Sequence, residues 1–390
     1  MAVLTNSKNI KKGDTFVALG KGTNFIDEAL QKGADKIIKG EVQFGKAAKK
    51  YLQSLRKQNP QLQVIGITGS FGKTTVKDLL GFILSKAGQT VFAKESYNNE
   101  IGVPITIFAA DEKTEYLVLE MGANKIGDIK YLTDIAPLDV ACLLGVGSAH
   151  ISSFGNLDNI VSAKGEIFAG LKNGGVGFVP DFDKNAKNLI KIYNHKNIKT
   201  FSRFPSRSQS PSFISTNLLG EHNLSNISAV ISICEFLKID TQIVRNAIEQ
   251  FKPISKHRLQ LLEKPPITFL DDSYNANPAS MLSGLKTLLN LKKTYPKKYL
   301  RALAVLGKME ELGKESKNEH LEVGKAFQNS AVEKILVFGE KKLYGTSDKF
   351  LYFSSKLQIA DYIKKNAKKG DILLVKASNY SKLWEIVEGV

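Results

Sequence analysis

The residues best suited to chemistry form a glycine-rich loop, Gly66-Ile-Thr-Gly-Ser-Phe-Gly-Lys-Thr-Thr75, which follows the apolar run Leu62-Gln-Val-Ile65. Glycines let backbone N–H groups turn inward around phosphate oxygens, and the helix predicted after the loop presents its positive end to the same place. Lys73 can neutralise the β- and γ-phosphates of a nucleotide, and Thr74 is placed to ligate magnesium. The glycine spacing departs from G-x-x-x-x-G-K-[ST], because Ile67 stands at its first position. The loop nevertheless predicts a nucleotide-phosphate site, with an ordinary strand-to-helix turn as the alternative.

Three further polar positions follow predicted strands, where ligands bind in open parallel sheets. Glu120 closes the strand Tyr116-Leu-Val-Leu and suits a magnesium ligand, although a helix-initiating acid would have the same pattern. His150 follows a buried strand, and a lone histidine there is either a ligand or a satisfied polar contact. The turn from Leu270 to Met281 combines two acids, several amides and a proline. It can bind a ribose or adenine, or it can be only a capped βα loop.

Lys164 lies in a predicted amphipathic helix whose apolar residues face the core. These apolar residues are Ile160, Val161, Ile167, Phe168 and Leu171. By spacing alone, Lys164 is expected to be solvated.

Composition excludes several classes of protein. The chain is 43% hydrophobic and 24% charged, without an apolar run of eighteen residues or a signal-peptide pattern, so we expect a cytoplasmic protein without stable membrane insertion. The only cysteines, Cys142 and Cys234, lie in apolar segments and are predicted to be buried thiols.

The net charge of +17 comes from scattered lysines without a nucleic-acid-reading motif. We therefore expect anionic small-molecule substrates and no nucleic acid, while a nucleic-acid-binding ATPase would show steeply salt-dependent binding.

The 390 residues are enough for two or three domains. Alternating strand and helix patterns predict an α/β protein in three parts. These are a small, shortened α/β domain over residues 1–62, a central parallel-sheet P-loop ATPase domain over 63–262, and a Rossmann-like α/β domain over 263–390. An amphipathic helix from Glu41 to Gln58 is expected to connect the first two parts.

With these motifs assembled, the chain resembles the Mur ligases, the ATP-dependent amino-acid ligases of peptidoglycan precursor synthesis, and most closely those of the MurF type. Matching segments run from about Gly13 to Lys376. Besides the phosphate loop, they include Asn98-Asn-Glu-Ile-Gly-Val-Pro104, Glu120-Met-Gly-Ala123, Ala163-Lys-Gly-Glu-Ile-Phe168, Gly220-Glu-His-Asn-Leu-Ser-Asn226 and Asp271-Asp-Ser-Tyr-Asn-Ala-Asn-Pro278. The Lys-Gly-Glu-Ile element and the Tyr-Asn turn are particular to the MurF type.

The resemblance implies a monomeric ligase that adds D-alanyl-D-alanine to UDP-N-acetylmuramoyl-tripeptide (UDP-MurNAc-tripeptide) through an acyl phosphate, releasing ADP and phosphate. It also implies that the third domain closes onto the second. The cofactors implied are ATP and two Mg²⁺ ions, with Thr74 and Glu120 holding the first ion and His150 and a carbamoylated Lys164 holding the second. The catalytic residues implied are Lys73, His150, Lys164 and Arg258. The ATP-binding residues implied are Gly69, Ser70, Phe71, Gly72, Lys73, Thr74, Thr75, Asn223, Asn226, Arg258, Asp272 and Tyr274. The substrate-binding residues implied are Ser7, Asn98, Asn99, Asn275, Asn277, Lys376 and Ser378.

Departures from the family pattern lie on the substrate side. Thr5-Asn-Ser-Lys8 replaces an Asp-Ser-Arg segment associated with the UDP-sugar, and the third domain has Gly307-Lys-Met309 and Lys376-Ala-Ser-Asn379 in place of Gly-Asp-Met and Lys-Gly-Ser-Arg. One alternative is therefore a Mur-ligase-like enzyme that acts on a different carboxylate, such as another wall precursor or a folate. A second alternative is a non-catalytic nucleotide-binding partner, against which the retained metal-ligand candidates argue.

Overall fold

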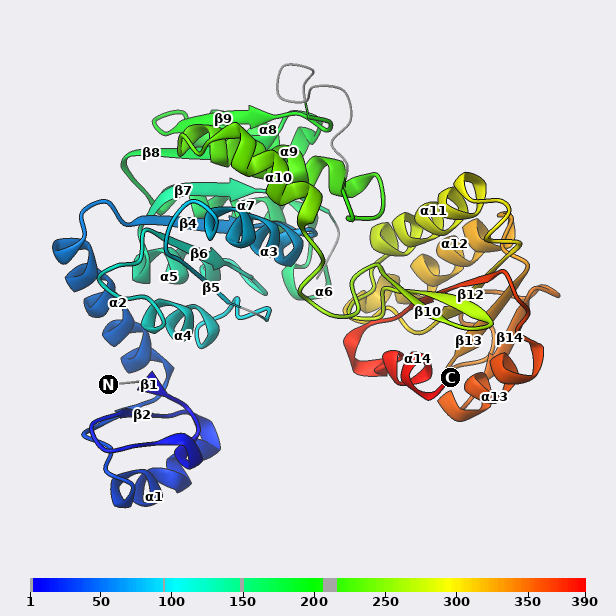
Figure 1. Ribbon diagram of the computed structural model, residues 1–390, viewed down its shortest axis with the longest axis horizontal. Helices are drawn as coiled ribbons and strands as arrows, with labels where there is room; N and C mark the ends of the chain where they lie inside the picture. Colours follow the sequence, from blue (N-terminus) through cyan, green and yellow to red (C-terminus); the bar gives the residue numbers. More distant parts are fainter. Residues whose placement is uncertain (1–2, 94, 148–150, 206–215) are drawn as a thin grey trace. The chain divides into compact units, whose positions relative to one another are not determined.

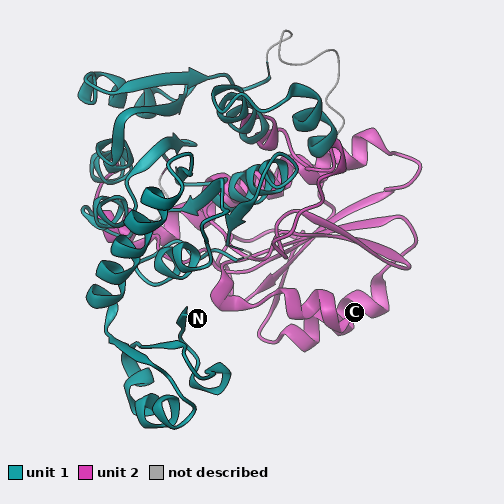
Figure 2. Ribbon diagram, turned by 60° about the vertical axis from the view of Figure 1, so that its left-hand side comes forward, with its two compact units in different colours: residues 1–146, 158–212, 226–248 teal, residues 147–157, 213–225, 249–390 magenta. Residues whose placement is uncertain are grey.

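The computed structural model describes residues 3–93, 95–147, 151–205 and 216–390. The chain packs into two compact units, shown in Figure 2. Unit 1 comprises residues 1–146, 158–212 and 226–248, and unit 2 comprises residues 147–157, 213–225 and 249–390. Unit 1 contains a three-stranded and a six-stranded sheet, and unit 2 contains one six-stranded sheet. The predicted α/β class is confirmed, while the predicted boundaries after residues 62 and 262 stay predictions.

The first sheet of unit 1 is small and parallel. Its strands are β1 (Val3–Leu4), β2 (Thr15–Ala18) and β3 (Lys36–Lys39), in that spatial order. One face of β2 packs through Phe16 against Ala29 of α1 (Ile26–Gln31). The other face packs through Val17 against Phe44 of α2 (Glu41–Gln58), so both faces of this short sheet are covered.

Helix α2 has the bounds that the sequence predicts. Its buried face includes Leu52 and Leu55, at the spacing of an amphipathic helix. Tyr51 donates a hydrogen bond of 2.8 Å to the carbonyl of Ala110, and Arg56 forms an ion pair of 2.8 Å with Asp139. These contacts fix the helix to the six-stranded sheet of the same unit.

All six strands of the second sheet of unit 1 are parallel, in the order β5-β6-β4-β7-β8-β9 (Figure 1). The strands are β4 (Gln63–Thr68), β5 (Thr90–Phe92), β6 (Tyr116–Glu120), β7 (Leu138–Leu143), β8 (Leu171–Pro180) and β9 (Asn197–Phe201). The helices between and after them are α3 (Lys73–Leu84), α4 (Gly102–Phe108), α5 (Asp128–Ile135), α6 (Ile151–Phe154), α7 (Leu157–Ala169), α8 (Lys184–Ile192), α9 (His222–Phe236) and α10 (Thr241–Gln250). Of these, α6 and the first turn of α9 belong to unit 2.

The register of this sheet aligns the strand ends that carry the candidate site. Ile67 of β4 pairs with Glu120 of β6, and Thr68 pairs with Leu143 of β7. The Thr68 hydroxyl donates a hydrogen bond of 2.8 Å to the carbonyl of Met121, just beyond β6. The carboxyl ends of β4, β6 and β7 therefore meet at one edge, where ligands bind in such sheets.

The sheet of unit 2 has the order β10-β11-β15-β12-β13-β14, and only β10 runs antiparallel to its neighbour. Its strands are β10 (Gln260–Lys264), β11 (Ile267–Asp271), β12 (Arg301–Leu306), β13 (Lys334–Phe338), β14 (Phe350–Phe353) and β15 (Asp371–Lys376). Its helices are α11 (Pro278–Thr294), α12 (Ser316–Gln328), α13 (Lys356–Asn366) and α14 (Trp384–Gly389). Short 3₁₀ turns lie at Ser7–Asn9, Gly20–Phe25, Gly313–Glu315 and Asn379–Ser381.

Adjacent residues of the unit 2 strands pack into two different hydrophobic cores, one on each face of the sheet, because side chains of a strand alternate between its faces. Leu270 and Leu374 pack with the residues of α11 and α12, whereas their neighbours Phe269 and Val375 pack with those of α13 and α14. The sheet is thus buried on both faces, as expected of parallel sheets.

Several short elements were not predicted from the sequence, including β3, β5, α4, α8, β9, β10, β14 and α14. Both cysteines are buried thiols, as predicted, and burial raises the pKa of each. Among the described residues, no helix combines the length and apolar character needed to cross a membrane.

Candidate active site

The glycine-rich loop joins β4 to α3 as predicted. Gly69 has a φ of +153° and Gly72 a φ of +78°, conformations that side chains rarely adopt. A Cβ atom at Gly72 would also lie 2.5 Å from the Oδ1 atom of Asn226, in α9. The Lys73 ammonium donates a hydrogen bond of 2.8 Å to the Gly69 carbonyl, so the charged group lies against the loop that contains it. The loop thus places a cation and the N-terminus of a twelve-residue helix at one point, which is an anion-binding arrangement.

Other members of the predicted ATP set differ in exposure. Ser70 and Thr74 are buried, whereas Phe71 is 42% exposed beside the loop. Asn226 is buried in α9. Asn223, one turn earlier in α9, is buried too and donates a hydrogen bond of 2.7 Å to the Leu219 carbonyl.

The segment between β5 and α4 supplies one hydrogen-bond partner for the Thr74 side chain and one for the Glu120 side chain. The Thr74 hydroxyl lies 3.0 Å from the Ser96 hydroxyl, and Asn98 donates a hydrogen bond of 2.9 Å to Oε1 of Glu120. Glu120 is only 2% exposed, and no described residue forms a hydrogen bond with its Oε2 atom. A buried carboxylate oxygen without a partner is costly unless a cation or water binds it. One carboxylate and one hydroxyl suit Mg²⁺, which keeps several waters when bound to protein.

Lys164, in α7, is 1% exposed, so the expectation of a solvated lysine is wrong. Lys164 lies three or four residues from Ile160, Val161, Ile167 and Phe168, so helical spacing in fact puts it on the buried apolar face of α7. The charged residue type, not the spacing, favoured the solvated interpretation. Within the described residues, no hydrogen bond or ion pair joins its ammonium to an acid. Burial, together with the nearby Lys73 cation, lowers the pKa of Lys164 from 10.5 to about 7. Lys164 is therefore a buried amine that loses its proton readily, while His150 lies outside the described residues.

The position of α7 depends on Glu166, two residues beyond Lys164. Its carboxylate accepts hydrogen bonds of 2.7 Å from the N–H of Gly127 and 2.9 Å from the N–H of Lys130. These donors belong to the first turn of α5, whose own N-cap residue, Gly127, has no side chain to satisfy them. Glu166 thus caps α5 and ties it to the helix that carries Lys164.

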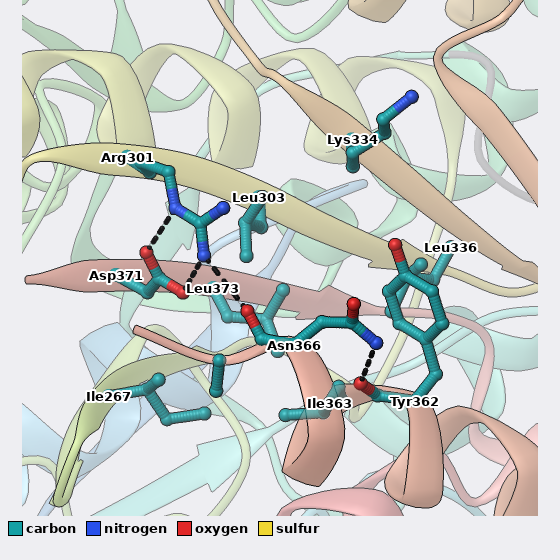
Figure 3. A pocket seen from close by; sticks show the side chains of 11 residues that line it. Ile267, Arg301, Leu303, Lys334, Leu336, Tyr362, Ile363, Asn366, Asp371 and Leu373 are labelled. Carbon is teal, nitrogen blue, oxygen red and sulfur yellow. Dashed lines mark hydrogen bonds and ion pairs between the residues drawn. The ribbon is translucent and has the colours of Figure 1, made fainter. Parts of the chain in front are cut away.

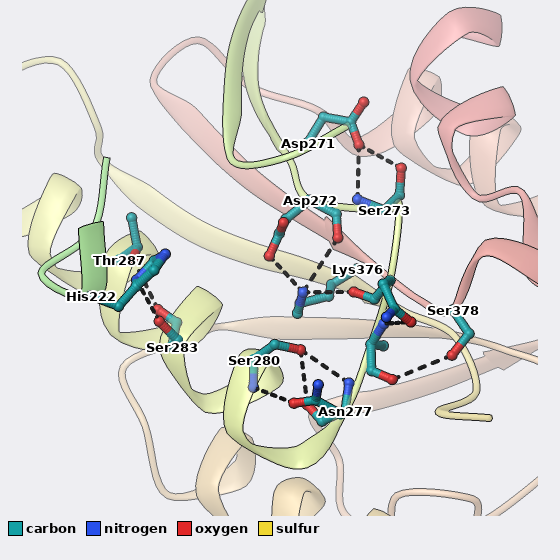
Figure 4. Close-up of polar contacts among 12 residues, drawn as sticks. His222, Asp271, Asp272, Ser273, Asn277, Ser280, Ser283, Thr287, Lys376 and Ser378 are labelled. Carbon is teal, nitrogen blue, oxygen red and sulfur yellow. Dashed lines mark hydrogen bonds and ion pairs between the residues drawn. The ribbon is translucent and has the colours of Figure 1, made fainter. Parts of the chain in front are cut away.

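In unit 2, the turn after β11 gathers several of the predicted residues (Figure 4). Lys376, 1% exposed, forms an ion pair of 2.6 Å with Asp272 and donates a hydrogen bond of 2.9 Å to the Asn275 carbonyl. A third, longer contact of 3.4 Å reaches the Asp272 carbonyl. Because these contacts use all three ammonium protons, Lys376 holds the turn in place.

The remaining predicted residues of unit 2 form local contacts. Asn277 caps α11 by accepting a hydrogen bond of 2.9 Å from the N–H of Ser280. Ser378 accepts a hydrogen bond of 2.9 Å from the N–H of Glu310. The Arg258 guanidinium lies 4.1 Å from the centroid of the Tyr274 ring, a cation–π contact.

Sequence reasoning missed the residues that hold the loop after β12. His320 accepts a hydrogen bond of 2.9 Å from the N–H of Met309 and contacts the Ser316 carbonyl at 2.6 Å through Nδ1. The pair of contacts requires a neutral ring with its proton on Nδ1. Burial lowers the pKa of His320, which favours that neutral form. Tyr344 donates a hydrogen bond of 2.6 Å to the Gly307 carbonyl.

Two predicted substrate residues of unit 1 have structural partners. Ser7 is buried and donates a hydrogen bond of 3.0 Å to Glu28, and Asn99 accepts one of 2.9 Å from the N–H of Gly102, the first residue of α4. The structure therefore gives these residues folding roles, and their contacts with substrate stay predictions.

A pocket of unit 2 lies at the opposite ends of the strands from these loops (Figure 3). Its lining includes Arg301, Lys334 and Asp371, which are the first residues of β12, β13 and β15. Arg301 binds Asp371 through contacts of 2.7 and 2.6 Å and reaches the Asn366 carbonyl, at the end of α13, at 3.1 Å. These contacts cap a helix and pair two charges, so we interpret the pocket as part of the packing of α13.

Comparison with known proteins matches both units to one family. The model of the Mur ligase middle domain matches residues 67–234, and that of the Mur ligase glutamate ligase domain matches residues 257–379. The UDP-N-acetylmuramoyl-tripeptide–D-alanyl-D-alanine ligase of Buchnera aphidicola subsp. Baizongia pistaciae is 31% identical, with 99% of this chain and 91% of that ligase covered.

Two crystal structures are similar over nearly the whole chain. MurF from Acinetobacter baumannii is 27% identical, with a TM-score of 0.88 over 99% of this chain and 92% of that one. MurF ligase from Thermotoga maritima in complex with ADP is 28% identical, with a TM-score of 0.84 over 100% of this chain and 96% of that one.

Proposed function

This chain belongs to the Mur ligase family, and from this membership we propose that it adds D-alanyl-D-alanine to UDP-MurNAc-tripeptide with hydrolysis of ATP to ADP and phosphate. The observation that carries the proposal is the phosphate loop at the carboxyl edge of a parallel sheet, with Lys73 over the loop. At the same edge, Glu120 has a carboxylate oxygen that no described residue binds. The names of the similar ligases from Buchnera aphidicola and Bacillus subtilis supply the substrates.

ATP is the nucleotide of this proposal. The loop offers backbone N–H groups and the N-terminus of α3 to the phosphates, and Lys73 must exchange its contact with the Gly69 carbonyl for one with phosphate oxygens. The similar Thermotoga ligase was crystallised with ADP, which supports a nucleotide site in this fold. We place the reaction in the cytoplasm and expect a monomer.

Two magnesium ions complete the proposal. Thr74 and Glu120 would hold the first ion, because they combine a buried hydroxyl with a buried carboxylate oxygen that has no hydrogen-bond partner in the described part of the chain. His150 and a carbamoylated Lys164 would hold the second, and the lowered pKa of Lys164 suits an amine that reacts with carbon dioxide. When bound, these ions neutralise phosphate charge and polarise the bonds that react.

The chemistry requires two anions to meet. An oxygen of the tripeptide carboxylate attacks the γ-phosphorus, the bond to the β-phosphate oxygen breaks, and ADP leaves. The amine of D-alanyl-D-alanine then attacks the acyl carbon, loses a proton, and phosphate leaves. Lys73 lowers the repulsion in the first step by placing a positive charge at the loop, which is electrostatic catalysis of the kind common in phosphoryl transfer.

The proposed site residues of unit 2 have two different roles, nucleotide binding and support of the turn after β11. Arg258 and Asp272 are proposed to bind the nucleotide, with Asp272 at the ribose. Lys376 is proposed to hold Asp272 and its turn in place, because its ammonium is occupied by protein oxygens.

Replacing Lys376 with methionine is expected to lower the free energy of unfolding by about 3 kcal/mol, because the change leaves the largely buried Asp272 carboxylate unpaired. Denaturation by urea measures the effect. Lys308, whose ion pair with Glu310 is partly exposed, provides the matched control, and Lys308→Met should cost less than about 1 kcal/mol. Equal stability of the two variants would show that the Lys376 pair does not hold the turn.

The substrates are tested by phosphate release from ATP with each co-substrate omitted in turn. The proposal predicts release only when UDP-MurNAc-tripeptide and D-alanyl-D-alanine are both present, with one ADP formed for each amide bond. Phosphate release at the same rate without either co-substrate would reject the proposal. Release with another carboxylate, such as a different wall precursor or a folate, would instead support a Mur-ligase relative with a different substrate.

A further inference from the structure

A short segment of unit 1, residues 95–99, contacts both candidate ligands of the first metal ion. Ser96 supplies the hydroxyl that lies 3.0 Å from Oγ1 of Thr74, and Asn98 supplies the amide that donates to Oε1 of Glu120 at 2.9 Å. Thr74 and Glu120 come from different elements, at the start of α3 and the end of β6. The 95–99 segment therefore links the two ligands through side chains that were assigned no role in metal binding.

The segment is itself anchored by a buried cation. Lys77, which is 0% exposed, hydrogen-bonds through its ammonium to the Ala93 carbonyl and, at 3.3 Å, to the Glu95 carbonyl. Asp78 balances its charge through an ion pair of 2.6 Å. A buried ammonium is costly unless it is hydrogen-bonded, so moving the backbone carbonyls away from Lys77 would be unfavourable. The Lys77 contacts therefore hold this backbone in place.

The far end of the segment is also fixed. The N–H of Gly122, just beyond β6, donates a hydrogen bond of 2.7 Å to the Asn98 carbonyl. A Cβ atom at Gly102 would lie 2.5 Å from the Cα of Tyr97, so the start of α4 packs directly on the segment backbone. Held at both ends, the 95–99 segment is a rigid support for the side chains of Ser96 and Asn98.

We propose that Ser96 and Asn98 are positioning residues for the first divalent cation, an inference that rests on the proposed function. To ligate a cation through an Oγ1 lone pair, Thr74 must direct its proton elsewhere, and the Ser96 oxygen accepts it. Asn98 occupies Oε1 of Glu120 and thereby leaves Oε2, which no described residue binds, for the cation. The substrate contact that the family resemblance implies for Asn98 stays a prediction.

The arrangement favours a small, hard cation such as Mg²⁺ or Mn²⁺, because both donors are oxygens. Partners that orient metal ligands in this way commonly change metal affinity by 10- to 100-fold when they are removed. A merely structural role for the two hydrogen bonds would leave metal affinity unchanged in a folded variant.

The test measures the dissociation constant of Mn²⁺ by electron paramagnetic resonance, with a non-hydrolysable ATP analogue bound to the full chain. Ser96→Ala and Asn98→Ala should each weaken Mn²⁺ binding by about 10- to 100-fold, while binding of the analogue in EDTA stays unchanged. Ser96→Thr keeps the hydroxyl and should restore wild-type affinity. Ser85→Ala is the matched control, because Ser85 lies exposed just beyond α3 and its hydroxyl donates to the Phe82 carbonyl.

A double-mutant cycle distinguishes positioning from an independent effect. In a Thr74→Ala background, Ser96→Ala should add little, because its effect acts through Thr74. Mn²⁺ affinity in Ser96→Ala equal to that of Ser85→Ala would overturn the inference, even if Asn98→Ala fails to fold. Failure of the wild-type chain to bind the analogue at all would instead reject the proposed function.

Discussion

Replacement of Lys73 with methionine is expected to lower kcat by about 1,000-fold without unfolding the chain. Methionine has similar length and fills the same space, but it removes the only charge that the loop places at the start of α3. Loss of one well-placed electrostatic contact to a reacting group costs this much in other enzymes. Co-substrate-dependent phosphate release measures the effect, and circular dichroism checks the fold.

The control for this variant is Lys86→Met. Lys86 is an exposed lysine just beyond the same helix, where its ammonium lies 5.1 Å from the centroid of the Phe82 ring. Its replacement should leave kcat within about twofold of wild type, since surface substitutions away from a site are nearly neutral. Near-normal turnover by Lys73→Met would show that the loop does not bind the reacting phosphate.

The second large effect is expected at Lys164. Lys164→Ala removes the proposed carbamate ligand, and kcat should fall by about 1,000-fold because the second ion supplies several kcal/mol of charge stabilisation. Short carboxylates such as formate or acetate should restore part of the lost rate by occupying the vacated space. Full activity of the unrescued variant would exclude a carbamoylated ligand.

The pKa of Lys164 gives this account a pH dependence. Only the neutral amine attacks carbon dioxide, forming an N–C bond and releasing a proton. With the pKa lowered to about 7, the neutral form predominates above pH 7 and disappears as the pH falls below 7. An ordinary lysine would be neutral in only about 1 in 3,000 molecules at pH 7.

Carbamate formation should therefore rise through pH 7. The carbamate resonance in ¹³C NMR after addition of ¹³C-bicarbonate reports it, and Lys164→Ala identifies that resonance. A signal that first appears near pH 10 would show that burial does not depress the pKa of Lys164.

The sequence predicted the elements with strong patterns. Helix α2 and strand β6 begin and end where the sequence places them, because an amphipathic stripe and an apolar run mark them clearly. The proline at position 278 indicates the start of α11 in the same way, whereas the cap formed by Asn277 is visible only in the structure. The phosphate loop was also predictable, since its residues are contiguous and lie between a strand and a helix.

The rest of the site depends on contacts between distant residues, which local patterns do not contain. The pairing of Asp272 with Lys376 spans 104 residues, and the contact of Asn98 with Glu120 spans 22 residues. Strand β5 and helix α4, which flank the 95–99 segment, are only 3 and 7 residues long and give weak signals. The burial of Lys164, by contrast, is contained in the helical spacing, because Lys164 lies on the same face of α7 as Ile160 and Ile167.

Activation of the tripeptide carboxylate by ATP can be followed with UDP-MurNAc-tripeptide labelled with ¹⁸O in that carboxylate. Mass spectrometry of the products follows the label. We expect each released phosphate to carry one ¹⁸O atom and the new amide to keep the other, because the acyl phosphate passes one carboxylate oxygen to phosphorus. Amide product accompanied by unlabelled phosphate, or labelled substrate recovered unchanged while ATP is consumed, would contradict this mechanism.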